Sequence, residues 1–345
     1  MTVHRTIPAI ALAAAASLGA NANAQVVYAS GQFFDGVDRV NRFFEIDLAT
    51  GEATPASPPL AFFPQAGLAG TPDGRLIGIR AGTIFEIDPA DGTETPIASV
   101  GVTATSLDVL TDGRVFTVAR DAFGNYQQLF LIDIAAQTAT PLGSPNEIGD
   151  AIDIARGTPL GTAEPFVIAL GSVGPTVYAI DADSGTLVAI DPDTGDASVV
   201  GVVGAITASL TPRFTGLAAL TGADTNGDGE YDTLISGVNF DNDFNSLTDP
   251  LNGRFGGVAA YNLATGEATV IGNNSGIIFF GMGAIPAAVS CRADLNNDGV
   301  VDADDFFLFL QLFADADPIA DINGDGVIDA DDFFEYLALF AAGCP

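Results

Sequence analysis

The octapeptides FEIDLATG at residues 44–51 and FEIDPADG at residues 85–92 carry the pattern on which the fold depends. Each reads as an apolar strand that ends in Ile-Asp, then a short turn that ends in Gly, then a Thr- and Ala-rich strand. Glycine supplies the positive φ that such a turn needs, and the Asp can bond the backbone two residues later. Four further copies read FLID at 130–133, whose turn lacks Gly, YAID at 178–181, VAID at 188–191 and AAYN at 259–262.

The copies recur at the length of a four-stranded propeller blade. Asp47 and Asp88 are 41 residues apart, and Asp88 and Asp133 are 45 apart. A second hairpin, seen as TPDGRL at 71–76 and LTDGRV at 110–115, lies between copies, so each repeat holds about four short strands. Later intervals are longer and indicate insertions. We predict a mainly β fold, a β-propeller over 25–287 with about six blades (five to seven fit the length), closed by pairing 26–30 with 276–282.

The turn pattern resembles the blade repeats of PQQ-like and YVTN-type propellers, whose units read much like Y-A-I-D-x-x-T-G. Blades of PQQ-like enzymes usually carry a Trp that docks one blade on the next, and this chain has no Trp but 24 Phe. The resemblance therefore implies the fold, with Phe in that packing role, and does not imply a quinone cofactor. Arg80 and Arg120 fall at equivalent places in two repeats. They can reach a substrate on the funnel face or simply solvate the strand ends.

The charge excludes several classes of function. All 11 basic residues are Arg, against 44 Asp and Glu, and the only His is His4. Since His4 lies in a segment that we expect to be removed, the mature chain has no His and no Lys, and it cannot build a Ser-His-Asp or Cys-His nucleophile, a Schiff base, an HExxH zinc site or a P-loop. A net charge of −33 repels nucleic acid and anionic membranes. Carboxylate chemistry, hard-cation binding or a purely non-catalytic role remain.

Residues 1–24 read as a secretory signal peptide. A short basic start precedes an Ala-rich apolar run, and Ala22, Asn23 and Ala24 form a small-x-small cleavage site before Gln25. The run is too short for an uncleaved membrane anchor, so we expect a secreted or cell-surface protein without membrane insertion. Cys291 and Cys344 would then meet an oxidising compartment, where pairing is the default.

A calcium loop is predicted inside the propeller. Residues 224–232 read DTNGDGEYD, with oxygen ligands at positions 1, 3, 5 and 9, a Gly at position 6 and a backbone carbonyl at position 7. The loop resembles the short calcium loops of FG-GAP-type blades, and the alternative is an acidic insert without an ion. The expected ligands of one Ca²⁺ are Asp224, Asn226, Asp228, Glu230 (carbonyl) and Asp232.

The last domain, residues 288–345, contains a duplicated motif. ADLNNDGVVDADDFFLFLQLFA starts at Ala293 and ADINGDGVIDADDFFEYLALFA starts 27 residues later at Ala320. Two tandem loops with oxygen ligands at positions 1, 3, 5, 7, 9 and 12 indicate two bound Ca²⁺ ions. The expected ligands are Asp294, Asn296, Asp298, Val300 (carbonyl), Asp302 and Asp305 in the first loop, and Asp321, Asn323, Asp325, Val327 (carbonyl), Asp329 and Asp332 in the second.

Each loop is followed by a helix but lacks the entering helix of an EF-hand. This half-motif, twice, resembles the type I dockerin, in a variant that ends in Gly-Cys as Gly343 and Cys344 do. The resemblance covers about residues 290–345 and implies a calcium-folded module that binds a cohesin domain. A Cys291–Cys344 disulfide would clasp the ends of the module, with unpaired or intermolecular thiols as the alternative.

The expected helices, 305–313 and 332–340, present a buried face of Phe306, Phe309, Leu310, Phe313, Phe333, Tyr336, Leu337 and Phe340. Phe307 and Phe334 fall off that face in symmetric positions and indicate a docking patch, or else they pack on the linker or on the other helix. In dockerins, loop positions 10 and 11 also contact the cohesin, which implies roles for Ala303, Asp304, Ala330 and Asp331.

Two functions fit these features. The first is a non-enzymatic propeller attached to a cohesin-bearing surface or complex through the dockerin-like module. The second is an extracellular hydrolase or lyase of carbohydrate or lactone that uses propeller carboxylates and Ca²⁺, because dockerin-bearing chains are often polysaccharide-degrading enzymes and two carboxylates suffice for glycoside hydrolysis. Carboxylates from different blades that converge on the axis with a raised pKa would favour the second.

Overall fold

The computed structural model describes residues 25–34, 38–61, 67–104, 106–120, 127–163, 167–181, 184–203, 213–225, 231–241, 254–272, 274–275, 277–286, 293, 295–296, 301–315, 317–320, 322 and 327–342. The predicted signal peptide, residues 1–24, lies outside this part of the chain, as do Cys291 and Cys344. None of the described helices is long and apolar enough to cross a membrane.

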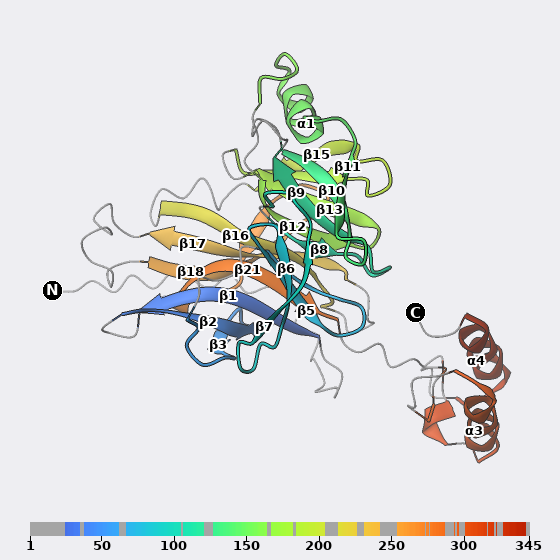
Figure 1. The fold of residues 1–345 in the computed structure, drawn as a ribbon. Helices are drawn as coiled ribbons and strands as arrows, with labels where there is room; N and C mark the ends of the chain where they lie inside the picture. The colour runs from blue at the N-terminus through green and yellow to red at the C-terminus, as the bar shows by residue number, and fades with distance from the viewer. Residues whose placement is uncertain are drawn as a thin grey trace.

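The described strands form a five-bladed β-propeller (Figure 1). Each blade has four antiparallel strands, and β20 (Asn274–Ser275) adds to β18 in the fifth. Neighbouring blades contact one another through their first strands, in the cyclic order β21, β4, β8, β12 and β16, so these five are innermost. Listed from the innermost strand outwards, the first blade consists of β21 (Ile277–Ile285), β1 (Val26–Phe34), β2 (Arg39–Ile46) and β3 (Ala53–Pro55), and the second of β4 (Gly67–Gly70), β5 (Leu76–Arg80), β6 (Thr83–Ile87) and β7 (Glu94–Ser99). The third blade consists of β8 (Asp108–Val109), β9 (Val115–Arg120), β10 (Gln127–Asp133) and β11 (Thr138–Leu142), and the fourth of β12 (Val167–Val173), β13 (Thr176–Asp181), β14 (Thr186–Ile190) and β15 (Ala197–Val202). The fifth blade consists of β16 (Arg213–Ala223), β17 (Thr233–Asp241), β18 (Arg254–Tyr261) and β19 (Ala268–Val270).

Ring closure follows the prediction. The first strand, β1, pairs antiparallel with the last, β21, from Val26 opposite Ile285 to Phe33 opposite Ile277. The side chain of Asn274, in β20 of the fifth blade, adds two hydrogen bonds to the outer part of the first blade: its Nδ2 donates to the Gly51 carbonyl at 2.8 Å, and its Oδ1 accepts from the Ala53 amide at 2.8 Å. The pairing of β1 with β21 thus holds the two ends of the propeller sequence in one sheet.

The blade count of five lies within the predicted range and is one below the favoured six. Five of the six Ile-Asp copies close the third strand of a blade, β2, β6, β10, β14 or β18. The sixth, which ends at Asp181, closes the second strand β13 of a blade that already contains the copy ending at Asp191. Counting by average blade length missed this because the later blades are longer.

The repeated turn has the predicted geometry. Gly51, Gly92, Gly195 and Gly266 have φ between 68° and 80°, and the preceding acid bonds the turn backbone, as where the Ala49 amide donates to Asp47 Oδ1 at 2.8 Å. In the copy without Gly, Gln137 takes this role with φ 56°. That conformation is unfavourable for a residue with a Cβ.

Five hydrophobic clusters fill the five gaps between adjacent blades. Phe43, Phe44, Phe116 and Phe279 are among the largest fully buried side chains. The Phe279 ring meets Phe44 edge to face at 6.4 Å and lies against Gly256 of the fifth blade, where a Cβ would be 2.7 Å from the ring. Phenylalanine therefore docks one blade on the next, as expected for a chain without Trp.

Helix α1 (Glu147–Arg156) is an insertion between β11 and β12. It packs on the outer strands of the third and fourth blades (Figure 1), and its Ile148 and Ile152 enter the hydrophobic cluster between them. This insertion accounts for part of the long interval between Asp133 and Asp191.

The C-terminal part contains α3 (Ala303–Ala314), the short 3-10 helix η1 (Pro318–Ala320) and α4 (Ala330–Ala342). Its core is built on Phe309, Ala320, Ile322 and Tyr336. Leu310, which was predicted to be buried, is 37% exposed, and Leu337 is outside the core, whereas Leu312 and Leu339 pack against it. The six aromatic residues of the predicted face are in this core or pack against it, so the predicted face is confirmed except at these two leucines.

Candidate functional site

The two C-terminal helices begin with the same polar arrangement. Asp302 is the N-cap of α3 and accepts from the Asp304 amide at 2.8 Å, while Asp305 completes a capping box. Asp305 also accepts from the amides of Asp302 at 3.0 Å and Asn296 at 3.1 Å. In the second repeat the equivalent Asp332 accepts from the Asp329 amide at 2.8 Å. Each predicted calcium loop is therefore tied to its helix by the carboxylate at loop position 12.

These two carboxylates are fully buried, and Asp305 is held in its charged form. Asp305 and Asp332 each have 0% exposure. Burial acts to raise the pKa of Asp305, but several backbone hydrogen bonds, of which those from Asp302 and Asn296 are the largest, together outweigh it and the pKa is lowered. Residues 293–345 contain 13 acidic residues and no Arg or Lys. Because a buried charge is costly unless it is paired, this all-oxygen, all-acidic composition fits a divalent cation.

The structure covers half of the predicted ligands in this module. Those described are Asn296, Asp302, Asp305, Val327, Asp329 and Asp332; those outside the described residues are Asp294, Asp298, Val300, Asp321, Asn323 and Asp325. Among the described residues, no group of three His, Cys, Asp or Glu side chains is arranged to hold a metal ion. The complete loop geometry thus stays a prediction, and the buried position-12 carboxylates are what the structure adds to it.

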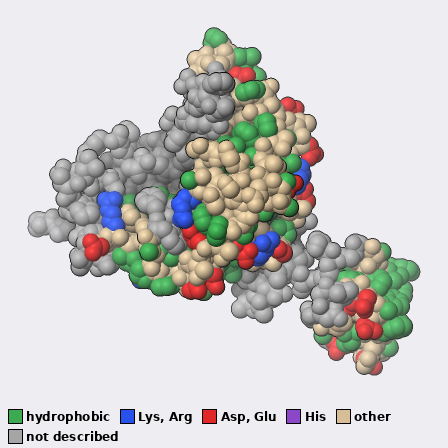
Figure 2. Space-filling view, in the orientation of Figure 1, with side chains coloured by type: hydrophobic (Ala, Val, Ile, Leu, Met, Phe, Trp, Pro, Cys, Tyr) green, Lys and Arg blue, Asp and Glu red, His purple; other side chains and the backbone are tan. Residues whose placement is uncertain are grey.

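All six residues predicted to contact a partner are exposed. Phe307 and Phe334 are 64% and 65% exposed, and Ala303, Asp304, Ala330 and Asp331 are also exposed. Each exposed ring contacts the ring before it on its own helix. The ring centroids are 6.2 Å apart for Phe307 and Phe306, and 5.9 Å apart for Phe334 and Phe333. On the face drawn in Figure 2, this part of the molecule shows hydrophobic and acidic side chains but no basic ones.

The described ends of the loop predicted to bind calcium in the propeller, 224–232, follow the innermost strand β16 and precede β17. Its described residues are Asp224, Thr225, Tyr231 and Asp232; Asn226, Asp228 and Glu230 lie outside the described part. Asp232 Oδ1 accepts from the Thr225 amide at 3.2 Å and from its hydroxyl at 2.8 Å, which closes the base of the loop. Asp224 is 8% exposed.

Both ends of this loop are bonded to the strands that close the ring. The Asp224 amide donates to Gln25 Oε1 at 2.8 Å, just before β1. The Tyr231 hydroxyl donates to the Ala284 carbonyl in β21 at 2.9 Å. The loop is therefore anchored at the point where β1 and β21 pair.

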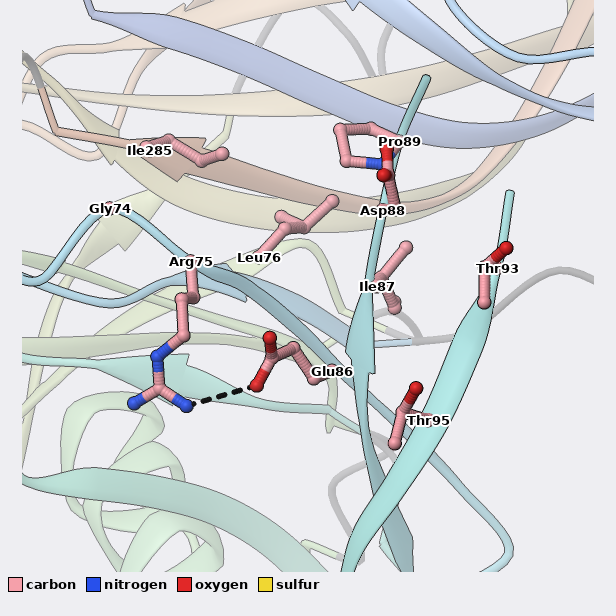
Figure 3. Close-up of a pocket in the computed structure, with 10 residues that line it drawn as sticks. All are labelled: Gly74, Arg75, Leu76, Glu86, Ile87, Asp88, Pro89, Thr93, Thr95 and Ile285. Carbon is pink, nitrogen blue, oxygen red and sulfur yellow. Dashed lines mark hydrogen bonds and ion pairs between the residues drawn. The ribbon is translucent and has the colours of Figure 1, made fainter. Parts of the chain in front are cut away.

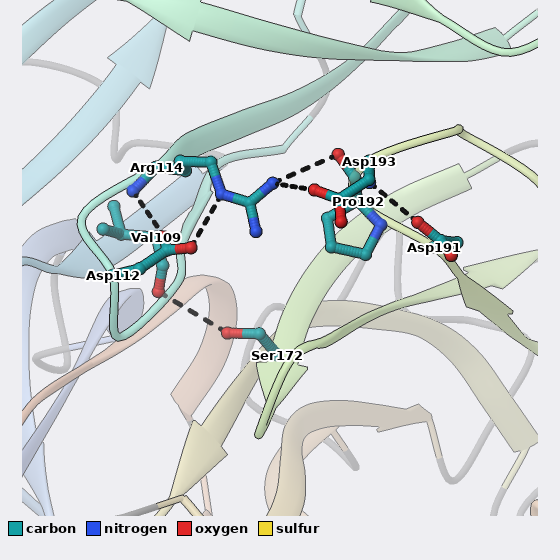
Figure 4. A network of polar contacts seen from close by, with 7 residues as sticks. All are labelled: Val109, Asp112, Arg114, Ser172, Asp191, Pro192 and Asp193. Atoms are coloured by element: carbon teal, nitrogen blue, oxygen red, sulfur yellow. Dashed lines mark hydrogen bonds and ion pairs between the residues drawn. The ribbon is translucent and has the colours of Figure 1, made fainter.

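A buried acid on the axis was missed by the sequence analysis. Asp108, in the innermost strand β8, is 3% exposed. Burial raises its pKa to about 7, against the opposing effects of the Ser172 hydroxyl and the Val109 backbone. The signal was present: SLDVL at residues 106–110 places one acid inside an apolar innermost strand. Ser172, at the equivalent level of β12, also donates a long bond to the Val109 carbonyl at 3.5 Å (Figure 4).

Arginine side chains in the surface hollows are already paired. Arg75 lines a cavity of about 290 Å³ with Glu86, Asp88 and Thr95 (Figure 3), and it contacts Asp73 at 2.8 Å and Glu86 at 3.1 Å. Arg114 borders a hollow of about 510 Å³ and contacts Asp112 at 2.7 Å and Asp193 of the next blade at 2.6 Å (Figure 4). These guanidinium groups stabilise turns and join blades.

Arg80, one of the two arginines at equivalent places in the repeats, is also paired with an acid. Arg80 donates to both carboxylate oxygens of Glu94, at 3.3 and 2.7 Å, and lies over the Phe85 ring at 4.8 Å. The side chain of Arg120, at the equivalent end of β9, lies outside the described residues. For Arg80 this supports a role at the strand end within its own blade.

Comparison with known proteins adds a distant likeness of fold. No family model and no curated protein sequence matches the chain. Among solved structures, the tricorn protease matches over 67% of this chain with 11% identity and a TM-score of 0.32, and this chain spans 20% of its length. A structure of a nidogen–laminin complex matches over 75% of this chain and 97% of its own, with 10% identity and a TM-score of 0.39. At these scores neither structure informs the function.

Proposed function

We propose that the chain is a secreted, non-enzymatic β-propeller protein that attaches to a cohesin-like domain through its calcium-dependent, dockerin-like C-terminal module. The observation that carries the proposal is the pair Asp305 and Asp332, fully buried at equivalent positions of two calcium-loop motifs in a segment without basic residues. Two Ca²⁺ ions would compensate these carboxylates and supply folding energy to a module too small for a large core.

Exposed apolar side chains support the docking role. Phe307 and Phe334 are separated by the same 27 residues as the loops and have nearly the same exposure. Large exposed aromatic rings are costly in water and are typical of the anchors of protein interfaces. Because each helix presents the same surface, either half of the module would fit one partner site, with Ala303, Asp304, Ala330 and Asp331 beside the rings.

A pull-down of the full chain with cohesin domains from the same secretome tests the proposal. We expect binding with Ca²⁺ and none with EDTA, and we expect the F307S/F334S double variant to lose binding. Ile319→Ser is the matched control, since Ile319 is 59% exposed in the same module but outside the predicted patch. Binding that survives in EDTA, or is weakened equally by Ile319→Ser, would overturn the proposed interface.

The alternative, a hydrolase or lyase acting on carbohydrate or lactone, needs two carboxylates that converge near the axis. Asp108 meets half of that requirement through its axial place and raised pKa. Its side chain is nearly inaccessible, which argues against contact with a sugar. Activity on a polysaccharide and lactone panel that disappears in Asp108→Asn would replace the binding role with this one.

A further inference from the structure

The end of the propeller axis contains a buried carboxylate oxygen without a partner. Asp108 Oδ2 makes no hydrogen bond to any described residue, although the side chain is 3% exposed. The groups that act on this carboxyl are the Ser172 hydroxyl and the Val109 backbone, and no arginine in the described chain is among them. A buried carboxylate with one oxygen unbonded and no counter-charge is unstable unless it is protonated or binds a cation.

The buried phenol of Tyr231 does not hydrogen-bond to this carboxyl. The Tyr231 hydroxyl donates its proton to the Ala284 carbonyl, so it is not donated to Asp108.

Two hydroxyl groups belong to neighbouring innermost strands. The Thr221 hydroxyl, in β16, accepts from the Ala284 amide at 3.2 Å, and the Ser172 hydroxyl lies at the same level in β12. The strands approach closely here, because a Cβ on Gly171 would lie 2.7 Å from the Thr221 backbone and one on Gly283 would lie 2.8 Å from the backbone of β4. The Ser172 hydroxyl of the fourth blade is thus close to the Asp108 carboxyl of the third, and the closely packed innermost strands leave little room for a bulky ligand.

We propose that this end of the axis binds one hard cation, with the carboxylate of Asp108 as its anchor and hydroxyl and carbonyl oxygens of neighbouring innermost strands as further ligands. Hard cations prefer oxygen ligands, and a strongly acidic protein concentrates cations around itself. This site is separate from the C-terminal loops and does not depend on the proposed function.

The test measures hydrogen exchange of the innermost strands β8 and β12 in the full chain. All buffers are above neutral pH and have the same ionic strength. The reference buffer contains choline chloride, the second contains sodium chloride in its place, and the third contains choline chloride with added calcium chloride. We expect the wild type to gain exchange protection with sodium or with calcium, and the buffer that produces the gain identifies the ion. We expect Asp108→Asn to show the same protection in all buffers. A wild type without any gain overturns the site, as does an Asp108→Asn variant that keeps the gain.

Two further variants remove the remaining ambiguity. Asp232→Asn alters the neighbouring predicted calcium loop and should keep the gain; if it loses the gain while Asp108→Asn keeps it, the ion belongs to that loop and the axial site is wrong. If Asp108→Asn does not fold, Ser172→Ala replaces it and should weaken the apparent cation affinity about tenfold or more. An unchanged affinity in Ser172→Ala would then overturn the proposal.

Discussion

The ring of Phe309 stacks on the ring of Tyr336, with centroids 3.9 Å apart and planes 10° from parallel. These residues are equivalent members of the two C-terminal repeats, 27 positions apart. When equivalent residues of a duplicated motif meet face to face, the two copies are related by a local twofold axis through the contact. The two predicted docking rings, Phe307 and Phe334, are then related by the same axis.

The stack should dominate the stability of the module. Tyr336 is fully buried, so Tyr336→Ala removes the stack and leaves a cavity, at a cost of about 3–5 kcal/mol. Tyr336→Phe keeps the ring and loses only the hydroxyl bond to the Ala293 carbonyl at 3.2 Å, at a cost of about 1 kcal/mol. Hydrogen exchange of α3 and α4 in the full chain would measure both, and equal effects would show that the ring contact is unimportant.

Removing calcium should unfold the same two helices and leave the propeller intact. We expect EDTA to abolish exchange protection in α3 and α4, because the buried carboxylates of Asp305 and Asp332 would lose their cations. Asp305→Asn should weaken calcium binding measured by calorimetry. Asp315→Asn removes the same charge from an exposed position at the end of α3 and should bind as the wild type does. Protection that persists in EDTA would contradict the calcium loops.

The turn without Gly offers a stabilising substitution. Gln137 has φ 56°, so Gln137→Gly should raise the free energy of unfolding by about 0.5–1 kcal/mol. Gly195 has φ 80° at the equivalent turn, and a Cβ there would lie 2.5 Å from Leu142 and Gly143 of the adjacent blade. Gly195→Ala should therefore destabilise by more than Gln137→Gly stabilises. Denaturant unfolding measures both, and a destabilised Gln137→Gly would contradict the strain argument.

Acid should loosen the segment that follows α1. Amides of Ala163 and Thr162 and the Thr158 hydroxyl donate to Asp153; the Ala163 amide is the largest cause of its lowered pKa. A carboxyl whose pKa is lowered in the folded state stabilises the fold at pH values above its pKa in the unfolded chain, 3.8. This stabilisation is lost as the pH falls through the pKa of the folded state. Asp153→Asn should lower the Tm at neutral pH, and its difference from the wild type should shrink below about pH 3.8. A constant difference across this range would exclude the carboxylate as the cause.

The contribution of helix α1 to the stability of the propeller should come from its buried face alone. Ile152 is 1% exposed in the cluster between the third and fourth blades, whereas Ile154 is 71% exposed. Ile152→Ala should cost about 2–5 kcal/mol, and Ile154→Ala should change stability by less than about 0.5 kcal/mol. Thermal unfolding of the two variants checks this, and a large effect of Ile154→Ala would indicate an additional contact at that surface.

Local sequence patterns determined the repeated unit, its turns and the starts of the two C-terminal helices. The reason is that these features depend on neighbours within a few residues: a Gly in left-handed conformation, an Asp that bonds the next amides, or a carboxylate three residues into a helix. Even Gln137, in the copy without Gly, adopts the turn that the pattern predicts. The pairing of β1 with β21 was also predictable, because a ring of repeats must join its ends.

Tertiary structure alone decided the number of blades, the exact face on which α3 and α4 meet and the environment of Asp108. Two Ile-Asp copies look alike in sequence, yet Asp181 and Asp191 close different strands of one blade, since strand position depends on pairing with distant residues. Asp108 is one acid among 44 in the sequence. Only the convergence of five innermost strands takes it out of water, and desolvation is what changes its chemistry.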